Sequence, residues 1–386
     1  MNNLKLAGGK REKTVIDVNG TLFGGGEIIL MAGPCAVESR EQVLQAAADV
    51  KKAGGKVMRG GVFKPRTSPY SFQGLGPAGL DYLVEAAREH DLLCVSEAID
   101  AASLELIAAK ADIIQIGARN MQNFSLLKLA GSLDKPVLLK RGLACTVEEW
   151  LLAAEYIMAA GNPRVILCER GIRTFETSTR STLDLSAIAV VRELSHLPVI
   201  VDPSHAAGRR ELVPALSKAA IGVGADGLLI EMHPEPETAR CDGIQSLRPG
   251  ELLQLAREIT HLAAALGRTY PGPSTKAESL DYPEPSAQAE TLDTLRGQID
   301  LVDRQIVALI ADRQELVRRV ANHKQVDKVR DGAREKEIVD RLGKYAAELG
   351  CSADLVKDLY HVMFNHGVRT QIETKLAGYT SCTGAK

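Results

Sequence analysis

The chain has 386 residues, which is too long for one ordinary hydrophobic core and favours two domains. Lysine plus arginine (47) nearly balance aspartate plus glutamate (49), so no charge excess favours nucleic acid or an anionic membrane as a partner. The 7 scattered cysteines argue against a disulfide framework and for a reducing, cytoplasmic location, and no run approaches the roughly 18 apolar residues that span a bilayer.

Residues 1–26 form a predicted N-terminal extension with a β-hairpin. Thr14–Val18 and Thr21–Phe23 read as short strands, and Asn19-Gly20 lies between them. Asn-Gly is the strongest short hairpin signal, since both positions of the turn need a positive φ. We expect this hairpin to cap the bottom of the domain that follows.

Residues 27–266 alternate strand-like and helix-like segments. Each apolar run ends in polar residues, and a helical pattern follows it. The predicted strands are Ile28–Ala32, Lys56–Arg59, Leu92–Ser96, Ile113–Gly117, Pro136–Lys140, Arg164–Cys168, Pro198–Asp202 and Gly227–Glu231. Eight such units in about 240 residues predict a (β/α)8 barrel. An open doubly wound sheet is the alternative, but no phosphate-binding fingerprint follows the first strand.

Polar side chains follow nearly every predicted strand, and in a barrel the carboxyl ends of the strands meet at the active site. One set, Cys35, His205, Glu231 and Asp242, offers the sulfur, nitrogen and oxygen ligands that suit a divalent metal such as Mn²⁺, Fe²⁺ or Zn²⁺. A second set is cationic and suits carboxylate or phosphate groups. Its members are Arg59, Lys64, Arg66, Arg119, Lys140 and Arg170. Each residue alone is more often structural or solvated; their joint position after successive strands indicates a site.

Residues 267–290 are rich in proline, serine and acidic residues and predict a flexible linker. From Leu292 apolar residues recur every three or four positions, which predicts a helix of about 35 residues, roughly 50 Å long. Two shorter helices are expected near Arg334–Leu349 and Ser352–Lys375, followed by a disordered tail at 377–386. So long a helix cannot bury its apolar stripe against two short ones. We therefore expect at least a homodimer through this helical domain, residues 291–376.

The barrel motifs resemble those of 3-deoxy-arabino-heptulosonate 7-phosphate (DAHP) synthase, type I-beta. In chain order they are MAGPCAVES, MRGGVFKPRTSPYSFQG, QIGARNMQNF, LLKRG, CERG, VDPSHAAG and IEMHPEPETARCDGIQSL, within residues 14–266. A related family, 3-deoxy-manno-octulosonate 8-phosphate synthase, differs in the loop after the second strand. Lys64-Pro65-Arg66-Thr67 in that loop favours erythrose 4-phosphate as the aldehyde substrate, and a sialate-type synthase fits less well still.

This resemblance implies that phosphoenolpyruvate condenses with erythrose 4-phosphate beside a divalent metal held by the sulfur, nitrogen and oxygen set. Arg59 and Lys140 match residues that hold the phosphoenolpyruvate carboxylate, and Glu97 matches one that orients a water. The residues that match its phosphate site are Lys64, Arg119, Arg170 and the Ala118 backbone N–H. Arg66 and Thr67 match residues that hold erythrose 4-phosphate.

The helical region resembles the all-helical chorismate mutase over residues 291–375, a family whose dimers exchange long helices. The matching segments are LRGQIDLVDRQIVALIADRQELVRRVANHK, VRDGAREKEIVDRL and VRTQIE. The implied carboxylate clamps are Arg313, Arg334 and, from the second protomer, Arg296. Lys324 and Gln371 match donors to the ether oxygen, Glu335 matches the residue that holds the hydroxyl, and Asp331 lies nearby. Gly367 departs from members with a small hydroxyl residue there, and the loop before Val329 is shorter.

Together the two resemblances imply a bifunctional enzyme of aromatic biosynthesis. The helical domain would isomerise chorismate to prephenate and mediate feedback inhibition by prephenate or chorismate. Two alternatives remain for it: a regulatory ligand-binding module without turnover, and a purely structural dimerisation tail.

Overall fold

The computed structural model describes residues 4–9, 12–64, 68, 70–273, 292–321, 330–348 and 350–382. It divides into two compact units, Met1–Ala277 and Glu278–Lys386. No helix in the described ranges is long and apolar enough to cross a membrane.

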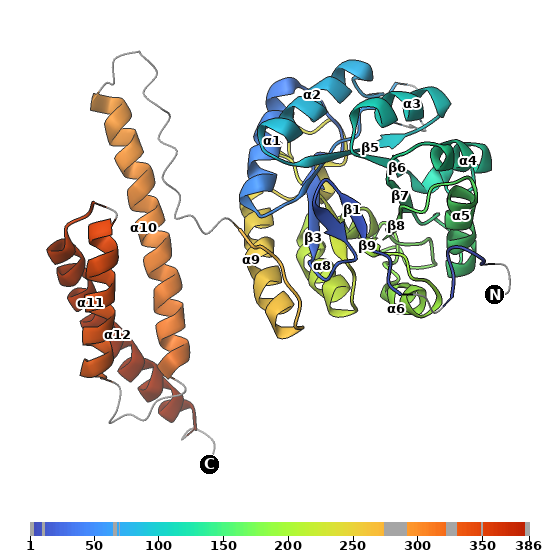
Figure 1. The fold of residues 1–386 in the computed structure, drawn as a ribbon. Helices are drawn as coiled ribbons and strands as arrows, with labels where there is room; N and C mark the ends of the chain where they lie inside the picture. Colours follow the sequence, from blue (N-terminus) through green and yellow to red (C-terminus); the bar gives the residue numbers. More distant parts are fainter. Residues whose placement is uncertain are drawn as a thin grey trace. The chain divides into compact units, whose positions relative to one another are not determined.

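Eight parallel strands in the first unit close into a barrel, as Figure 1 shows. They are β3 (Ile29–Gly33), β4 (Val57–Arg59), β5 (Leu93–Ala98), β6 (Ile113–Ile116), β7 (Val137–Lys140), β8 (Val165–Glu169), β9 (Val199–Val201) and β10 (Gly227–Glu231). The last strand pairs with the first, with Glu231 opposite Gly33. The predicted (β/α)8 barrel is therefore confirmed, and the open sheet is excluded.

Helices surround the strands (Figure 1). They are α1 (Arg40–Lys52), α2 (Pro77–Glu89), α3 (Ala101–Lys110), α4 (Phe124–Ser132), α5 (Val147–Ala159), α6 (Leu185–Leu194), α7 (Pro203–Ala207), α8 (Val213–Gly222) and α9 (Pro249–Ala265). Side-chain caps fix several of their starts; Thr146 and Glu149, for example, form a capping box at α5. The short helix α7 was not predicted, and it carries His205.

The N-terminal hairpin plugs the bottom of the barrel. Its strands are β1 (Ile16–Val18) and β2 (Thr21–Phe23), paired in the register that the Asn19-Gly20 turn sets. Ile16, Val18 and Phe23 are buried in one cluster with inward-facing strand residues such as Ile29 and Leu229. The hairpin thus fills the end of the barrel opposite the strand carboxyl ends.

The first residues of the predicted linker belong to the barrel instead. Thr269 bridges Glu27, and the Ile28 N–H donates to the Thr269 carbonyl. Tyr270 is buried, and its hydroxyl donates to the carbonyl of Ala53. The composition of 267–290 did not reveal this, because one buried aromatic side chain outweighs the surrounding prolines and serines. Residues 274–291 lie outside the described part of the chain.

Gly33 ends β3 where the chain turns toward the barrel mouth. Its φ is +147°, and a Cβ placed there would lie 2.2 Å from the backbone oxygen of Arg59. A side chain is excluded by this close approach of two backbones. The glycine therefore sets the path by which the following residues reach the mouth.

The second unit contains three described helices, α10 (Leu292–Ala321), α11 (Gly332–Glu348) and α12 (Ala353–Cys382). Helix α12 packs against both α10 and α11. It runs to Cys382, beyond the predicted end near Lys375 and into the tail for which we expected disorder; no proline interrupts that segment. Several large apolar side chains of α10 are exposed in the single chain, among them Ile299, Val307, Leu309 and Leu316.

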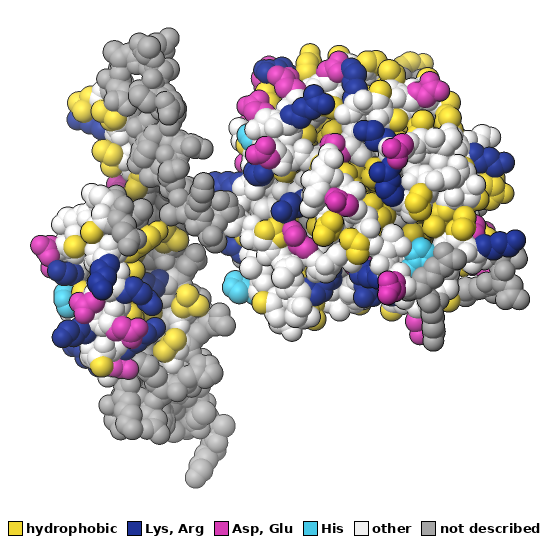
Figure 2. All heavy atoms as spheres, viewed as in Figure 1, with side chains coloured by type: hydrophobic (Ala, Val, Ile, Leu, Met, Phe, Trp, Pro, Cys, Tyr) yellow, Lys and Arg dark blue, Asp and Glu magenta, His cyan; other side chains and the backbone are white. Residues whose placement is uncertain are grey.

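The visible face of the barrel unit in Figure 2 carries charges of both signs, intermixed with apolar and neutral side chains. No block of one sign stands out on that face. This agrees with the near-zero net charge of the sequence.

Candidate active site

The four predicted metal ligands converge at the mouth of the barrel. One donor atom from each of Cys35, His205, Glu231 and Asp242 lies within 4.8 Å of the others. Cys35 follows β3, His205 lies on α7, Glu231 ends β10, and Asp242 precedes a 3-10 turn with φ of +52°. Strands β3 and β10 are neighbours, so barrel closure brings the first and last ligands together.

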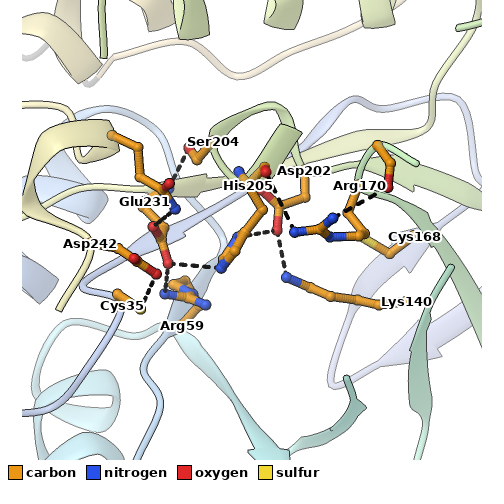
Figure 3. Close-up of polar contacts among 12 residues, drawn as sticks. Cys35, Arg59, Lys140, Cys168, Arg170, Asp202, Ser204, His205, Glu231 and Asp242 are labelled. Carbon is orange, nitrogen blue, oxygen red and sulfur yellow. Dashed lines mark hydrogen bonds and ion pairs between the residues drawn. The ribbon is translucent and has the colours of Figure 1, made fainter. Parts of the chain in front are cut away.

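Hydrogen bonds orient the imidazole and the Glu231 carboxylate (Figure 3). His205 Nδ1 lies 2.7 Å from Asp202 Oδ2, which leaves Nε2 facing Glu231 Oε1 at 3.4 Å. Glu231 Oε2 accepts from Gln245 Nε2 at 2.5 Å, and the Glu231 N–H donates to Ser204 Oγ. Such partners fix the orientation and basicity of metal ligands. Asp202 and Gln245 were not predicted as site residues; the Asp-x-x-His spacing in DPSH was the available signal for Asp202.

Two predicted cations, Arg59 and Lys140, lie against these carboxylates (both are labelled in Figure 3), and a third, Lys64, lies against the Cys35 thiol. Arg59 NH1 donates to Glu231 Oε1 at 3.0 Å and to the Pro34 carbonyl at 2.9 Å. Lys140 Nζ lies 2.5 Å from Asp202 Oδ2, and Lys64 Nζ lies 3.0 Å from Cys35 Sγ. All three side chains are buried. Each still has donor N–H groups beyond these contacts.

A cavity of about 470 Å³ is lined by three of the four ligands, Cys35, His205 and Asp242. Its lining includes the predicted residues Lys64, Glu97, Ala118, Arg119, Lys140 and Arg170. It also includes Arg173 and Arg180, which were not predicted because they lie within the long loop after β8 rather than at a strand end. Arg66 and Thr67, expected to hold the aldehyde substrate, lie outside the described residues.

Glu97 and Cys241 complete the inner wall. Gln115 Nε2 donates to Glu97 Oε2 at 3.1 Å, and a Cβ on Gly117 would fall 1.9 Å from Glu97 Oε1, so this glycine makes room for the carboxylate. Cys241 Sγ lies 3.0 Å from Cys35 Sγ. Cys241 was not predicted, although it directly precedes the predicted ligand Asp242.

The charges of the site shift one another's pKa values. Burial acts to raise the pKa of Glu231, but His205 and Arg59 outweigh it and lower that pKa. Burial is likewise outweighed at Asp242, where His205 and Arg180 lower the pKa to about 2. The hydrogen bond to Cys241, burial and the charge of Glu231 raise the pKa of Cys35 well above its usual value. Two carboxylates therefore stay ionised beside a thiol that the Cys241 hydrogen bond, burial and Glu231 keep protonated, and a divalent cation is the group that would stabilise its thiolate. The residues fit such a metal.

The Asp202 carboxylate should make the free energy of unfolding of the metal-free protein depend on pH. Burial acts to raise its pKa, but His205 and Lys140 hold it well below its usual value. In the unfolded chain Asp202 takes up a proton near pH 4, whereas in the folded protein it stays ionised to lower pH. The free energy of unfolding should therefore fall as pH decreases from about 5 to about 2. Asp202→Asn should flatten this slope in urea titrations. The fully exposed Asp134 provides the control, since Asp134→Asn should leave the slope unchanged. Equal slopes in wild type and Asp202→Asn would contradict the prediction.

The helical unit places one predicted clamp over aromatic rings. The Arg313 guanidinium lies 5.7 Å from the Tyr360 ring centre and 5.6 Å from that of Phe364. A cavity of about 190 Å³ beside it is lined by α10 and α12. Gln371 is buried, and its Oε1 lacks a hydrogen-bond partner among the described residues. An unpaired buried amide oxygen is consistent with a ligand-facing role.

The other predicted mutase residues are not brought together. Arg334 pairs with Glu337 at 2.7 Å, Asp331 caps the Arg334 N–H, and Glu335 pairs with Arg330 at 3.3 Å. Arg296 lies on α10 and is exposed in the single chain. Lys324 lies outside the described residues.

Comparison with known proteins decides the family. Residues 13–267 match the model described as the DAHP synthetase I family. The chain belongs to this family. Residues 295–372 match chorismate mutase type II. The chain is therefore a bifunctional enzyme of aromatic biosynthesis, with a DAHP synthase domain and a chorismate mutase domain, and both resemblances noted in the sequence are confirmed.

Named relatives support the synthase assignment. A phospho-2-dehydro-3-deoxyheptonate aldolase of Thermotoga maritima is 57% identical over 256 residues, covering 66% of this chain and 76% of the relative. A 2-dehydro-3-deoxyphosphooctonate aldolase of Syntrophotalea carbinolica is 33% identical over 261 residues, covering 63% and 93%. A crystal structure of the Thermotoga DAHP synthase superposes with a TM-score of 0.66 at 56% identity, covering 67% of this chain and 76% of that one. A truncated form gives 0.65 at 50% identity, covering 69% and 98%.

Proposed function

We propose that the barrel mouth condenses phosphoenolpyruvate with erythrose 4-phosphate around a divalent metal held by Cys35, His205, Glu231 and Asp242. The convergence of these four donors beside a cationic cavity carries the proposal. The metal would act as a Lewis acid toward the aldehyde oxygen. Zn²⁺, Fe²⁺ and Mn²⁺ all suit the mixed sulfur, nitrogen and oxygen donor set.

The cations of the cavity offset the charge of two phosphorylated substrates. Arg59 and Lys140 have N–H groups beyond those that contact Glu231 and Asp202, and these would hold the phosphoenolpyruvate carboxylate. Its phosphate would be held by Arg119, Arg170, Lys64 and the backbone N–H of Ala118. Arg66 and Thr67 hold erythrose 4-phosphate. Bringing these anions together in a partly buried site would otherwise cost several kcal/mol of repulsion.

In the reaction the enol methylene carbon bonds to the aldehyde carbon of erythrose 4-phosphate. Water adds to the neighbouring carbon, where Glu97 would orient it, and cleavage of the C–O bond then releases inorganic phosphate. Gln115 and the space left by Gly117 fix the Glu97 carboxylate for this task. Most of the barrier reduction is expected from this positioning of the two substrates.

Metal removal tests the barrel proposal. Phosphate release from the two substrates should disappear after exhaustive chelation and return on addition of Mn²⁺ or Zn²⁺, because the aldehyde then regains its Lewis acid. Loss of chorismate absorbance by the same sample should be unaffected, which serves as an internal control. Full phosphate release by protein shown to be metal-free would refute the proposed site.

For the helical domain we propose a homodimer that carries the mutase site. The exposed apolar side chains of α10 are the surface that a second copy would cover, with Arg296 of one protomer completing the site of the other. Arg313, Arg334, Lys324, Glu335 and Gln371 would hold the compact conformer of chorismate and stabilise the breaking ether, with Asp331 close by. A monomer in sedimentation equilibrium at micromolar concentration would contradict this arrangement.

We further propose that prephenate or chorismate bound to the helical domain inhibits the barrel. Coupling requires only that the ligand prefer one arrangement of the two units. Prephenate should therefore inhibit phosphate release by the full chain but not by the compact unit Met1–Ala277 alone. Undiminished inhibition of that unit would place the inhibitor site on the barrel.

A further inference from the structure

A buried ion pair lies behind the wall of the cavity. Arg141 NH1 donates to Glu169 Oε2 at 2.9 Å, and the two side chains are 4% and 0% exposed. Neither residue lines the cavity. Yet Arg141 directly follows Lys140, and Glu169 directly precedes Arg170, so the pair joins the ends of β7 and β8 at the two substrate-facing cations.

Both members of the pair are held by further contacts. Arg141 NH1 also donates to Asp184 Oδ2 at 2.9 Å, and its Nε donates to the Cys145 carbonyl. Glu169 Oε1 accepts from the Gly171 N–H at 2.7 Å, so the Glu169 side chain is also bonded to the backbone of the residue that follows Arg170. Buried charges with this many specific partners hold their geometry firmly.

Arg170 itself contacts neutral oxygen atoms. Its guanidinium donates to Ser181 Oγ at 3.2 Å and to the carbonyls of Gly171 and His205 at 3.3 and 3.4 Å. No carboxylate forms an ion pair with it among the residues that the structure describes. Its charge is thus available to an anionic ligand, although the buried Glu169 carboxylate is its neighbour in the chain.

We propose that Arg141 is a positioning residue that neutralises Glu169 and so keeps Arg170 available to the phosphate of phosphoenolpyruvate. A buried carboxylate that loses its partner is left uncompensated, which is unfavourable unless it takes up a proton or attracts another cation. Without Arg141 the Glu169 charge would act on the adjacent Arg170, which it already attracts, and this pairing would compete with the ligand. The inference rests on the proposed role of Arg170.

The test is a double-mutant cycle on the full-length, metal-loaded enzyme. Arg141→Met should raise the KM for phosphoenolpyruvate by about 10- to 100-fold, because a charge-assisted bond to the ligand is lost. Glu169→Gln keeps an oxygen for the Gly171 N–H and should leave KM within about threefold of wild type. Adding Glu169→Gln to Arg141→Met should return KM to that range, since no carboxylate then competes for Arg170. Direct titration of phosphoenolpyruvate by calorimetry should follow the same order.

Two further variants separate the outcomes. Arg170→Gln should weaken phosphoenolpyruvate binding; if it does not, the proposed role of Arg170 fails. If Arg170→Gln binds weakly but Arg141→Met binds normally, or if the double variant is as weak as Arg141→Met, the positioning role is overturned. If Arg141→Met does not fold, Glu169→Gln alone tests the positioning role. A KM as high as that of Arg170→Gln would overturn the role, because binding would then need the Glu169 charge itself, and a KM within the expected range supports it.

Arg164→Met is the control. Arg164 pairs with Asp134 near the amino ends of the same two strands and is partly exposed, so KM should not change.

Discussion

Replacing Cys35 by alanine is expected to lower DAHP synthase activity about 1,000-fold or more and to remove the bound metal. The substitution deletes the thiolate of the proposed metal site, and Lewis-acid polarisation of the aldehyde contributes several kcal/mol, with each 1.4 kcal/mol equal to a factor of ten. Phosphate release and metal content, measured on the same preparation, check the result. Chorismate turnover should stay at its wild-type value, since the helical unit is separate.

The chain offers a matched control for this experiment. Cys94 on β5 is as buried as Cys35 and lies in the hydrophobic core with Asp112 as a polar neighbour, but it is not among the four metal-ligand candidates. Cys94→Ala should therefore keep the metal and change synthase activity by less than about threefold, even if it costs some stability. If Cys35→Ala still bound metal at full stoichiometry, the Cys35 thiolate would not be a required ligand of the proposed site.

Replacing Arg313 by alanine is expected to lower chorismate mutase activity by about 1,000-fold, with synthase activity unchanged. The rearrangement uses no nucleophile, so catalysis depends on holding the dianion in a compact conformer, and removing one well-placed donor from such a site costs two to three orders of magnitude. The measurement is loss of chorismate absorbance at saturating substrate. The position of Arg313 beside the cavity between α10 and α12 supports this role.

The exposed Arg341 on α11 serves as the control, and Arg341→Ala should turn over chorismate normally. If Arg313→Ala also turns over chorismate at the wild-type rate, Arg313 only packs on Tyr360 and Phe364, and the proposal that it holds chorismate is wrong. If the wild-type chain shows no chorismate turnover at all, the mutase activity assigned through the family match is absent from this chain.

The barrel could be predicted from sequence because each strand is a short apolar run that ends at a polar residue. Cys35 and Glu231 were found for that reason, since their positions at strand ends place them at the mouth. Gln245 and Cys241 were missed because their roles follow from hydrogen-bond directions and sulfur contacts that no spacing reveals, whereas Asp202 had a signal in the Asp-x-x-His spacing that was not used. Tyr270 was assigned to a linker because its burial depends on Ala53, which is distant in the chain.

The helical unit shows a different limit of sequence reasoning. Its helices follow from a three-to-four residue periodicity, and all three were found. Whether the predicted clamp residues face one ligand depends on contacts between helices, and for Arg296 on a second chain. Periodicity assigns a residue to a face but does not say which surface covers that face.

Closure of the barrel by β10 against β3 has a consequence for how the enzyme matures. Cys35 and Asp242 are separated by 207 positions, so the ribosome delivers the thiol long before the carboxylate that it contacts. A nascent chain that lacks β10 has an open edge at β3 and only half of the donor set. Tight uptake of a divalent ion during synthesis would therefore mark the moment at which the last strand docks, and it could be used to time that event.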